Sequence, residues 1–200
     1  MKGTFVIHHS SFVIALVVVA ALTVVAIWML WFQTYHLLTV QPGVLYRDGN
    51  RGMREFKTAV RKVKPRTVVA LVDDYEWNDP AKPQFAQQME FLQRQGIAVE
   101  RIPVPLGGWP TQQDVQRFLA VCNDPARQPV LVHCAQGVRR TGMMVAAFQE
   151  SALGYTDDQA KAAMQSFGHS QRTVKDVQRF IDNYDPKAGA MRTELPMSEE

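Results

Sequence analysis

Apolar residues are concentrated near the start of the chain, where residues 12–32 contain no charged side chain. As a helix with a rise of about 1.5 Å per residue, this stretch would be about 31 Å long, close to the roughly 30 Å hydrocarbon core of a bilayer. Trp28, Trp31 and Tyr35 gather at its C-terminal end, where aromatic rings favour the headgroup level. The pattern predicts a transmembrane helix over 12–32, preceded by a short flank of residues 1–11.

A cleaved signal peptide is the alternative for this segment. Its apolar region exceeds the roughly 7 to 15 residues of a signal peptide, and it ends in bulky WMLWF instead of a small-residue cleavage site. Lys2 precedes it and residues 33–46 have no Lys or Arg, which favours a cytoplasmic N-terminus, although Arg47, Arg51 and Arg54 favour the opposite orientation. We therefore predict a single-pass membrane protein whose globular part lies on the extracytoplasmic side.

From residue 43 onward, short apolar runs alternate with amphipathic stretches, which is typical of an α/β fold. The near-continuous apolar strands predict a central, mostly parallel sheet flanked by helices. We expect a linker over 33–42, a globular domain over 43–186 and a disordered polar tail over 187–200. Predicted strands cover 44–47, 67–73, 97–104 and 129–134, and predicted helices cover 53–63, 83–95, 112–122, 141–153, 157–167 and 173–184.

Several helix ends carry recognisable signals. Thr111 with Asp114, and Thr156 with Gln159, have the spacing of capping boxes. Gly154 lies where a glycine commonly ends a helix.

Composition narrows the class of protein. The chain is 46% hydrophobic and 20% charged, so it is neither disordered nor fibrous. Its net charge of +3 is too small and too scattered for a dedicated nucleic-acid binder. Two cysteines, Cys122 and Cys134, cannot form a disulfide framework, so at least one is expected to be a reactive or packing thiol.

The most informative segment is HCAQGVRRTG, residues 133–142, which lies between the most apolar predicted strand and a predicted helix. Backbone N–H groups in such a loop form an anion-binding nest, and the helix N-terminus adds about half a positive charge. This setting should lower the pKa of the Cys134 thiol and make it a nucleophile at neutral pH. Arg140 can hold two phosphoryl oxygens with its planar guanidinium.

The rest of the loop completes a candidate phosphate site. Gly137 allows a sharp bend, and the Thr141 hydroxyl can stabilise the sulfur when it becomes a leaving group. We expect Cys134 and Arg140 to be catalytic, and the phosphate-binding residues to be Ala135, Gln136, Gly137, Val138, Arg139, Arg140 and Thr141.

This loop resembles the signature H-C-x5-R-[ST]-G of the cysteine-dependent protein tyrosine and dual-specificity phosphatases. The segments VLYRDGN, TVVALVDD, IPVPLGG and PVLVHC resemble the compact dual-specificity-like branch, so the likeness covers roughly residues 43–184. The resemblance implies phosphomonoester hydrolysis through a phosphocysteine on Cys134, without a metal or other cofactor. It implies phosphotyrosine or phosphoserine/threonine proteins, or phosphoinositides or inositol phosphates, as substrates.

The chain departs from that family at the general acid. The family uses an aspartate on a loop upstream of the cysteine, whereas residues 105–111, PLGGWPT, contain no carboxylate. Asp73 and Asp74 follow a predicted strand at the sheet edge where α/β proteins bind ligands, which makes them the first candidates. Asp114 is the third, although its spacing from Thr111 also suits a capping role.

Other residues near the motif have simpler interpretations. Cys122 is expected to pack in the core, and His133 to hold the loop by hydrogen bonds. Arg139 is either a solvated charge or an extension of the phosphate site.

Two alternatives to an active phosphatase stay open. A phosphate-binding pseudophosphatase would explain the missing acid. A rhodanese-like sulfurtransferase has a loop one residue shorter, which would end at Arg139, but the Arg140-Thr141-Gly142 ending argues against it.

Overall fold

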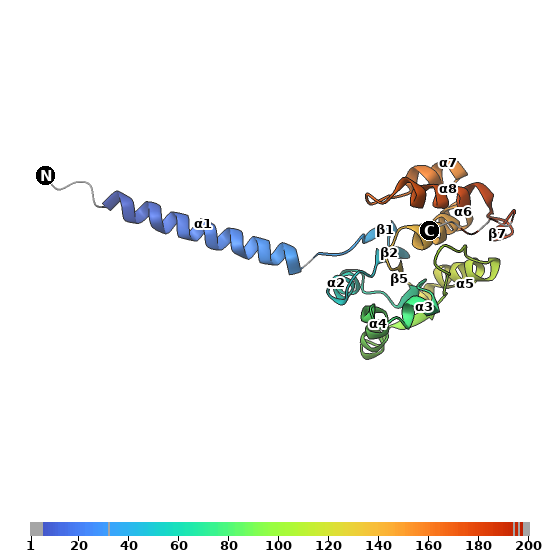
Figure 1. Ribbon diagram of the computed structural model, residues 1–200, viewed down its shortest axis with the longest axis horizontal. Helices are drawn as coiled ribbons and strands as arrows, with labels where there is room; N and C mark the ends of the chain where they lie inside the picture. The colour runs from blue at the N-terminus through green and yellow to red at the C-terminus, as the bar shows by residue number, and fades with distance from the viewer. Residues whose placement is uncertain (1–5, 32, 194, 196, 198–200) are drawn as a thin grey trace. The chain divides into compact units, whose positions relative to one another are not determined.

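The structure is a computed structural model, and it describes residues 6–31, 33–193, 195 and 197 (Figure 1). The chain forms two compact units, residues 1–33 and residues 34–200. The first unit contains the helix α1 (Val6–Trp31).

The prediction of a transmembrane helix over 12–32 is wrong, and with it the single-pass topology and the extracytoplasmic location. Among the described residues, none of the helices combines the length and the apolar character needed to cross a membrane. Part of the predicted flank, residues 1–5, lies outside the described residues.

The second unit is built on a five-stranded sheet with the strand order β1-β2-β5-β3-β4. β2, β5, β3 and β4 are parallel neighbours, and only the edge strand β1 is antiparallel to its neighbour β2. The sheet is therefore mixed, and the predicted α/β fold with a mostly parallel sheet is confirmed. The strands are β1 (Leu38–Gln41), β2 (Leu45–Gly49), β3 (Thr67–Ala70), β4 (Ala98–Arg101) and β5 (Val130–Cys134).

Helices cover both faces of this sheet (Figure 1). Both predicted capping boxes are present, at the starts of α5 and α7, and Gly154 ends α6 in the left-handed conformation. The helices are α2 (Met53–Val63), α3 (Asp74–Trp77), α4 (Pro83–Arg94), α5 (Gln112–Asn123), α6 (Arg139–Leu153), α7 (Asp157–Ala163) and α8 (Gln171–Asn183), with a 3-10 turn at Pro125–Arg127.

The buried apolar residues form one cluster on each face of the sheet. Residues of α5, α6 and α8 pack on one face, and residues of α2 and α4 pack on the other. Because strand side chains alternate, Val132 and Cys134 of β5 belong to the first cluster, and Leu131 belongs to the second. The alternation therefore places the Cys134 side chain on the α6 face.

The element boundaries differ from the predicted ones in several places. The predicted strand 97–104 stops at Arg101, because the chain leaves the ladder on its way to the loop 105–111. β1 lies within residues 33–42, the predicted linker, and the short strand β7 (Ala190–Met191) pairs with β6 (Tyr184–Asp185) inside the predicted tail. Residues 194, 196 and 198–200 of that tail lie outside the described residues.

Candidate active site

The loop that carries Cys134 lies at the carboxyl edge of the sheet, near its centre. Cys134 is the last residue of β5, the middle strand, and it is in register with Gly49 at the end of β2. The loop continues directly into α6, which begins at Arg139. Gly137 adopts a φ of +70°, and a Cβ there would lie 2.4 Å from the Asp48 carbonyl oxygen, so the bend requires glycine.

The surroundings of Cys134 favour its thiolate. The Gly137 N–H donates to the Cys134 Sγ at 3.1 Å, and the residue is only 2% exposed. Burial acts to raise the pKa of the thiol, but the Arg140 charge, the Thr141 hydroxyl and N–H, and the Gly137 N–H outweigh it and lower the pKa. A thiol of this kind is a nucleophile near neutral pH.

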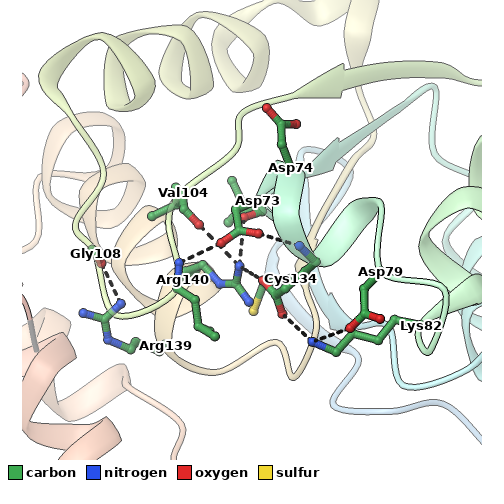
Figure 2. A network of polar contacts seen from close by, with 12 residues as sticks. Asp73, Asp74, Asp79, Lys82, Val104, Gly108, Cys134, Arg139 and Arg140 are labelled. Carbon is green, nitrogen blue, oxygen red and sulfur yellow. Dashed lines mark hydrogen bonds and ion pairs between the residues drawn. The ribbon is translucent and has the colours of Figure 1, made fainter. Parts of the chain in front are cut away.

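One nitrogen of the Arg140 guanidinium is hydrogen-bonded to the protein. Its Nη1 donates to Glu76 Oε2 at 2.5 Å and to the Val104 and Leu71 carbonyl oxygens at 3.3 and 3.5 Å. Its Nε and Nη2 have no hydrogen-bond partner in the described part of the chain. Figure 2 shows the Arg140 guanidinium beside the Cys134 sulfur. The two remaining nitrogens are therefore available to two oxygens of a phosphoryl group.

Arg139 points in a different direction. It donates to the Gly108 and Gly107 carbonyl oxygens at 2.6 and 3.2 Å and to Asp176 of α8 at 2.7 Å (Figure 2 shows the contact with Gly108). Its guanidinium also lies 5.0 Å from the centre of the Trp109 ring. Arg139 thus connects the loop 105–111 to α8.

A pocket of about 290 Å³ opens above these residues. Its floor is the candidate catalytic loop, residues 134–138, and its walls come from three other segments: α3, the loop 105–111 and the start of α8. The lining residues are Glu76, Leu106, Gly107, Cys134, Ala135, Gln136, Arg139, Arg140, Arg172, Thr173 and Asp176. The pocket therefore combines the Cys134 thiol with Arg139, Arg140 and Arg172, as a phosphate site requires.

The sequence pattern of the family "DSP-PTPase phosphatase fused to NAD+ Kinase" matches residues 62–183, which is more than half of the chain. The chain belongs to this family. A stretch of 54 residues is also 35% identical to "Probable NAD kinase 2, chloroplastic" of Oryza sativa subsp. japonica. That match covers 27% of this chain and 6% of the rice protein, so the chain spans only a small part of that relative.

Solved structures share the fold of this family member at low sequence identity. The catalytic domain of the PP-IP phosphatase SIW14 from S. cerevisiae is 19% identical, with a TM-score of 0.62 over 76% of this chain and 87% of that one. A variant of P. aeruginosa TpbA in complex with pTyr is 20% identical, with a TM-score of 0.58 over 78% and 88%. PTPMT1 in complex with PI(5)P is 16% identical, with a TM-score of 0.50 over 73% and 94%. These likenesses show that the chain shares its fold with these proteins.

The three predicted acid candidates are all engaged in contacts within the protein. Asp73 accepts hydrogen bonds from the backbone N–H groups of Glu76 and Leu106, at 2.7 and 2.9 Å. Asp74 pairs with Arg101 at 2.5 Å, and its side chain is 69% exposed. Asp114 forms the capping box at the start of α5. The carboxylates that line the pocket are instead Glu76, which binds Arg140, and Asp176, which binds Arg139.

Three residues that the sequence did not predict contact the HCAQGVRRTG segment from distant parts of the chain. Glu76 lies on the four-residue helix α3, and a hint was available, because it closely follows a strand that ends at the ligand-binding edge. Arg47 of β2 is 3% exposed and donates to the Gly137 carbonyl oxygen at 2.7 Å. His36 donates to the neighbouring Gln136 carbonyl oxygen at 2.7 Å. No sequence signal marks these last two contacts.

The structure also locates the other thiol and the histidine before Cys134. Cys122 lies fully buried in the core, and burial raises its pKa. Burial lowers the pKa of His133 to about 4, so the ring is neutral at physiological pH. Across the described residues, no three His, Cys, Asp or Glu side chains come together as a metal site would require.

Proposed function

We propose that this protein is a phosphatase that works through a phosphocysteine on Cys134. The observation that carries the proposal is the Arg140 guanidinium: three protein oxygens fix its Nη1, and its other two nitrogens stay open beside a cysteine whose pKa is lowered. This arrangement supplies a nucleophile and a two-oxygen clamp in one pocket.

The reaction would proceed in two displacements. The Cys134 thiolate attacks phosphorus, the Sγ–P bond forms and the bond from phosphorus to the leaving oxygen breaks. Water then attacks the phosphocysteine, the Sγ–P bond breaks, and inorganic phosphate and the thiolate are released. Arg140 and the loop N–H groups stabilise the charge on the phosphoryl oxygens during both steps.

Without a general acid from the protein, hydrolysis is restricted to substrates with a good leaving group. Asp73, Asp74 and Asp114 are engaged in the fold, Glu76 is paired with Arg140 and Asp176 with Arg139, so the leaving oxygen would take its proton from water. We therefore propose substrates whose leaving group is weakly basic, such as an aryl phosphate or a phosphoanhydride, over simple alkyl phosphates. SIW14 is named as a PP-IP phosphatase and TpbA was solved with pTyr, which supports these two kinds of substrate.

The rhodanese-like alternative is less compatible with the site. A loop ending at Arg139 would need that side chain over the cysteine, whereas Arg139 binds Gly108 and Asp176. The pseudophosphatase alternative is tested directly by turnover.

A leaving-group series tests the proposal. The rate constant kcat/KM of the 200-residue chain is measured for aryl phosphates of graded phenol acidity, an inositol pyrophosphate, and the alkyl phosphates phosphoserine and glycerol phosphate, with Cys134→Ser as the background. We expect aryl phosphates to react at least about 100-fold faster than alkyl phosphates, because leaving-group protonation typically contributes 10² to 10⁴-fold. A rate independent of the leaving group would show that a protein acid acts. Vanadate binding without turnover of any substrate would identify a pseudophosphatase.

A further inference from the structure

The segment just before β1 contacts the catalytic loop directly. The Gly49 N–H donates to the Tyr35 carbonyl oxygen at 2.9 Å, which attaches this segment to the end of β2. The next residue, His36, places its Nδ1 2.7 Å from the carbonyl oxygen of Gln136. A carbonyl oxygen only accepts hydrogen bonds, so the proton of this contact lies on Nδ1.

That carbonyl belongs to the same peptide group as the N–H that reaches the nucleophile. In the Gln136–Gly137 peptide, the carbonyl oxygen accepts a hydrogen bond from His36, and the N–H donates to the Cys134 Sγ at 3.1 Å. Because a peptide group is planar, fixing the oxygen on one side also fixes the N–H on the other. Arg47 holds the following carbonyl, that of Gly137, in a similar way.

The backbone of His36 has an uncommon conformation that its surroundings must stabilise. Its φ of +64° lies in the left-handed region, which is uncommon for residues other than glycine. Its ring is stacked between Tyr35 and Phe167, with ring centres 3.9 and 4.1 Å away, and Phe167 also has a positive φ of +50°. Such conformations cost free energy and are concentrated at functional sites.

We propose that His36 is a positioning residue of the active site, whose Nδ1–H holds the Gln136 carbonyl outward and so directs the Gly137 N–H at the Cys134 sulfur. This assignment rests on the proposed role of Cys134 as the nucleophile. It extends the active site to a residue about 100 positions earlier in the chain, outside the region that matches the family. Removing the donor frees the peptide to rotate and weakens one hydrogen bond to the thiolate.

The charged neighbours of His36 are compatible with a neutral, donating ring. Burial lowers the pKa of His36, the contact with Gln136 raises it, and His169 and Arg47 lower it further. The net direction is downward, so the ring donates as a neutral imidazole at physiological pH.

Two substitutions separate the hydrogen bond from the ring stacking. His36→Asn keeps an N–H donor near the position of Nδ1 and tolerates the positive φ, but it loses the stacked ring. His36→Phe keeps a ring between Tyr35 and Phe167 but has no donor. His169→Phe is the control, because His169 touches the His36 ring at its edge without a hydrogen bond to the loop.

The measurement is the alkylation rate of Cys134 by iodoacetamide against pH, followed by peptide mass spectrometry, which needs no hydrolytic activity. At a pH below the thiol midpoint, His36→Phe should react about three- to tenfold more slowly than wild type, which corresponds to a rise of about half to one pH unit in the midpoint. His36→Asn and His169→Phe should stay within about twofold of wild type. His36→Met is a second variant without a donor, in case the phenylalanine variant does not fold by circular dichroism.

The outcomes separate this proposal from the proposed function. A wild-type Cys134 with an ordinary thiol midpoint would overturn the nucleophile itself. A low midpoint in wild type that His36→Phe and His36→Met leave unchanged would overturn only the role of His36. The same would follow if His36→Asn slowed alkylation as much as His36→Phe, because the ring, and not the donor, would then be what matters.

Discussion

At the scale of single residues, Arg140 contacts the protein through one guanidinium nitrogen and leaves the other two for the ligand. Nη1 is bound by Glu76, Val104 and Leu71, whereas Nε and Nη2 are left for phosphoryl oxygens. A lysine offers one point charge and cannot satisfy both sides at once.

We therefore expect Arg140→Lys to lower kcat/KM for p-nitrophenyl phosphate by at least about 100-fold, the typical cost of losing one oxyanion donor. Arg139→Lys is the matched comparison. Its kcat/KM should fall by less than about tenfold, because Arg139 donates hydrogen bonds to the loop 105–111. Steady-state kinetics of both variants would check this. The reverse order of effects would favour the shorter loop that ends at Arg139.

Asp48 is a second residue with a distinct energetic role. It is fully buried beneath the catalytic loop, and burial raises its pKa to about 8, against the opposing effect of the Gly49 N–H. Its ordinary value is 3.8, so between these values the unfolded chain ionises Asp48 while the folded chain keeps it protonated. Asp48 therefore makes its full contribution to the free energy of unfolding below about pH 3.8, and this contribution is lost as the pH rises toward 8.

Asp48→Asn stays neutral at every pH and should remove this dependence. Relative to wild type, the free energy of unfolding of the variant should increase by about 1.4 kcal/mol per pH unit between pH 5 and 7. Urea unfolding at several pH values measures the difference, with the exposed Glu90→Gln as control. Parallel pH profiles for wild type and Asp48→Asn would contradict the assignment.

The residues that sequence could predict are those with a local pattern. Cys134 and Arg140 lie in one ten-residue motif between a strand and a helix, so a nucleophile and a phosphoryl clamp could be predicted there from the sequence alone. Glu76 and His36 reach the same loop from 64 and 100 residues away. Contacts of that kind depend on which strands become neighbours, which spacing along the chain does not encode.

At the scale of elements, residues from two helix starts contact the loop 105–111. Asp73, at the start of α3, accepts the Leu106 N–H, and Arg139, at the start of α6, donates to Gly107 and Gly108. In these contacts Asp73 orients a wall of the pocket, which differs from the acid role that its position after β3 suggested.

Asp73→Asn tests which role holds. The amide retains one acceptor and loses the other, so we expect a several-fold loss of kcat/KM that is equal for p-nitrophenyl phosphate and for an alkyl phosphate. Asp74→Asn, at an exposed carboxylate on the same helix, should change neither rate. A selective loss on the alkyl substrate of about 100-fold would identify Asp73 as the general acid after all.

Helices whose starts carry a local sequence signal were predicted well, whereas the short strand β1 was not. The capping boxes located the starts of α5 and α7 because side chains within three residues create them. β1 was missed because a four-residue edge strand has almost no pattern of its own and exists through its pairing with β2. α6 begins at Arg139, two residues before the predicted start, because its N-cap Val138 makes no side-chain hydrogen bond and so leaves no sequence signal of the helix start.

At the scale of the whole molecule, composition and pattern predicted the α/β class but not the strand order. β5 lies between β2 and β3, so the last strand of the sheet along the chain sits at its centre. This order brings the carboxyl ends of three parallel strands to the catalytic loop. The apolar character of residues 12–32 led to a membrane prediction that the described helices do not support.

The central claim is that Cys134 carries the phosphoryl group during turnover. The most direct measurement is rapid acid quenching of the wild-type chain during turnover of p-nitrophenyl phosphate, followed by mass spectrometry of its peptides. We predict one added phosphoryl group on the peptide that contains Cys134, and neither the adduct nor turnover in Cys134→Ser. Hydrolysis that persists in Cys134→Ser, or a phosphoryl group found on another residue, would contradict the account.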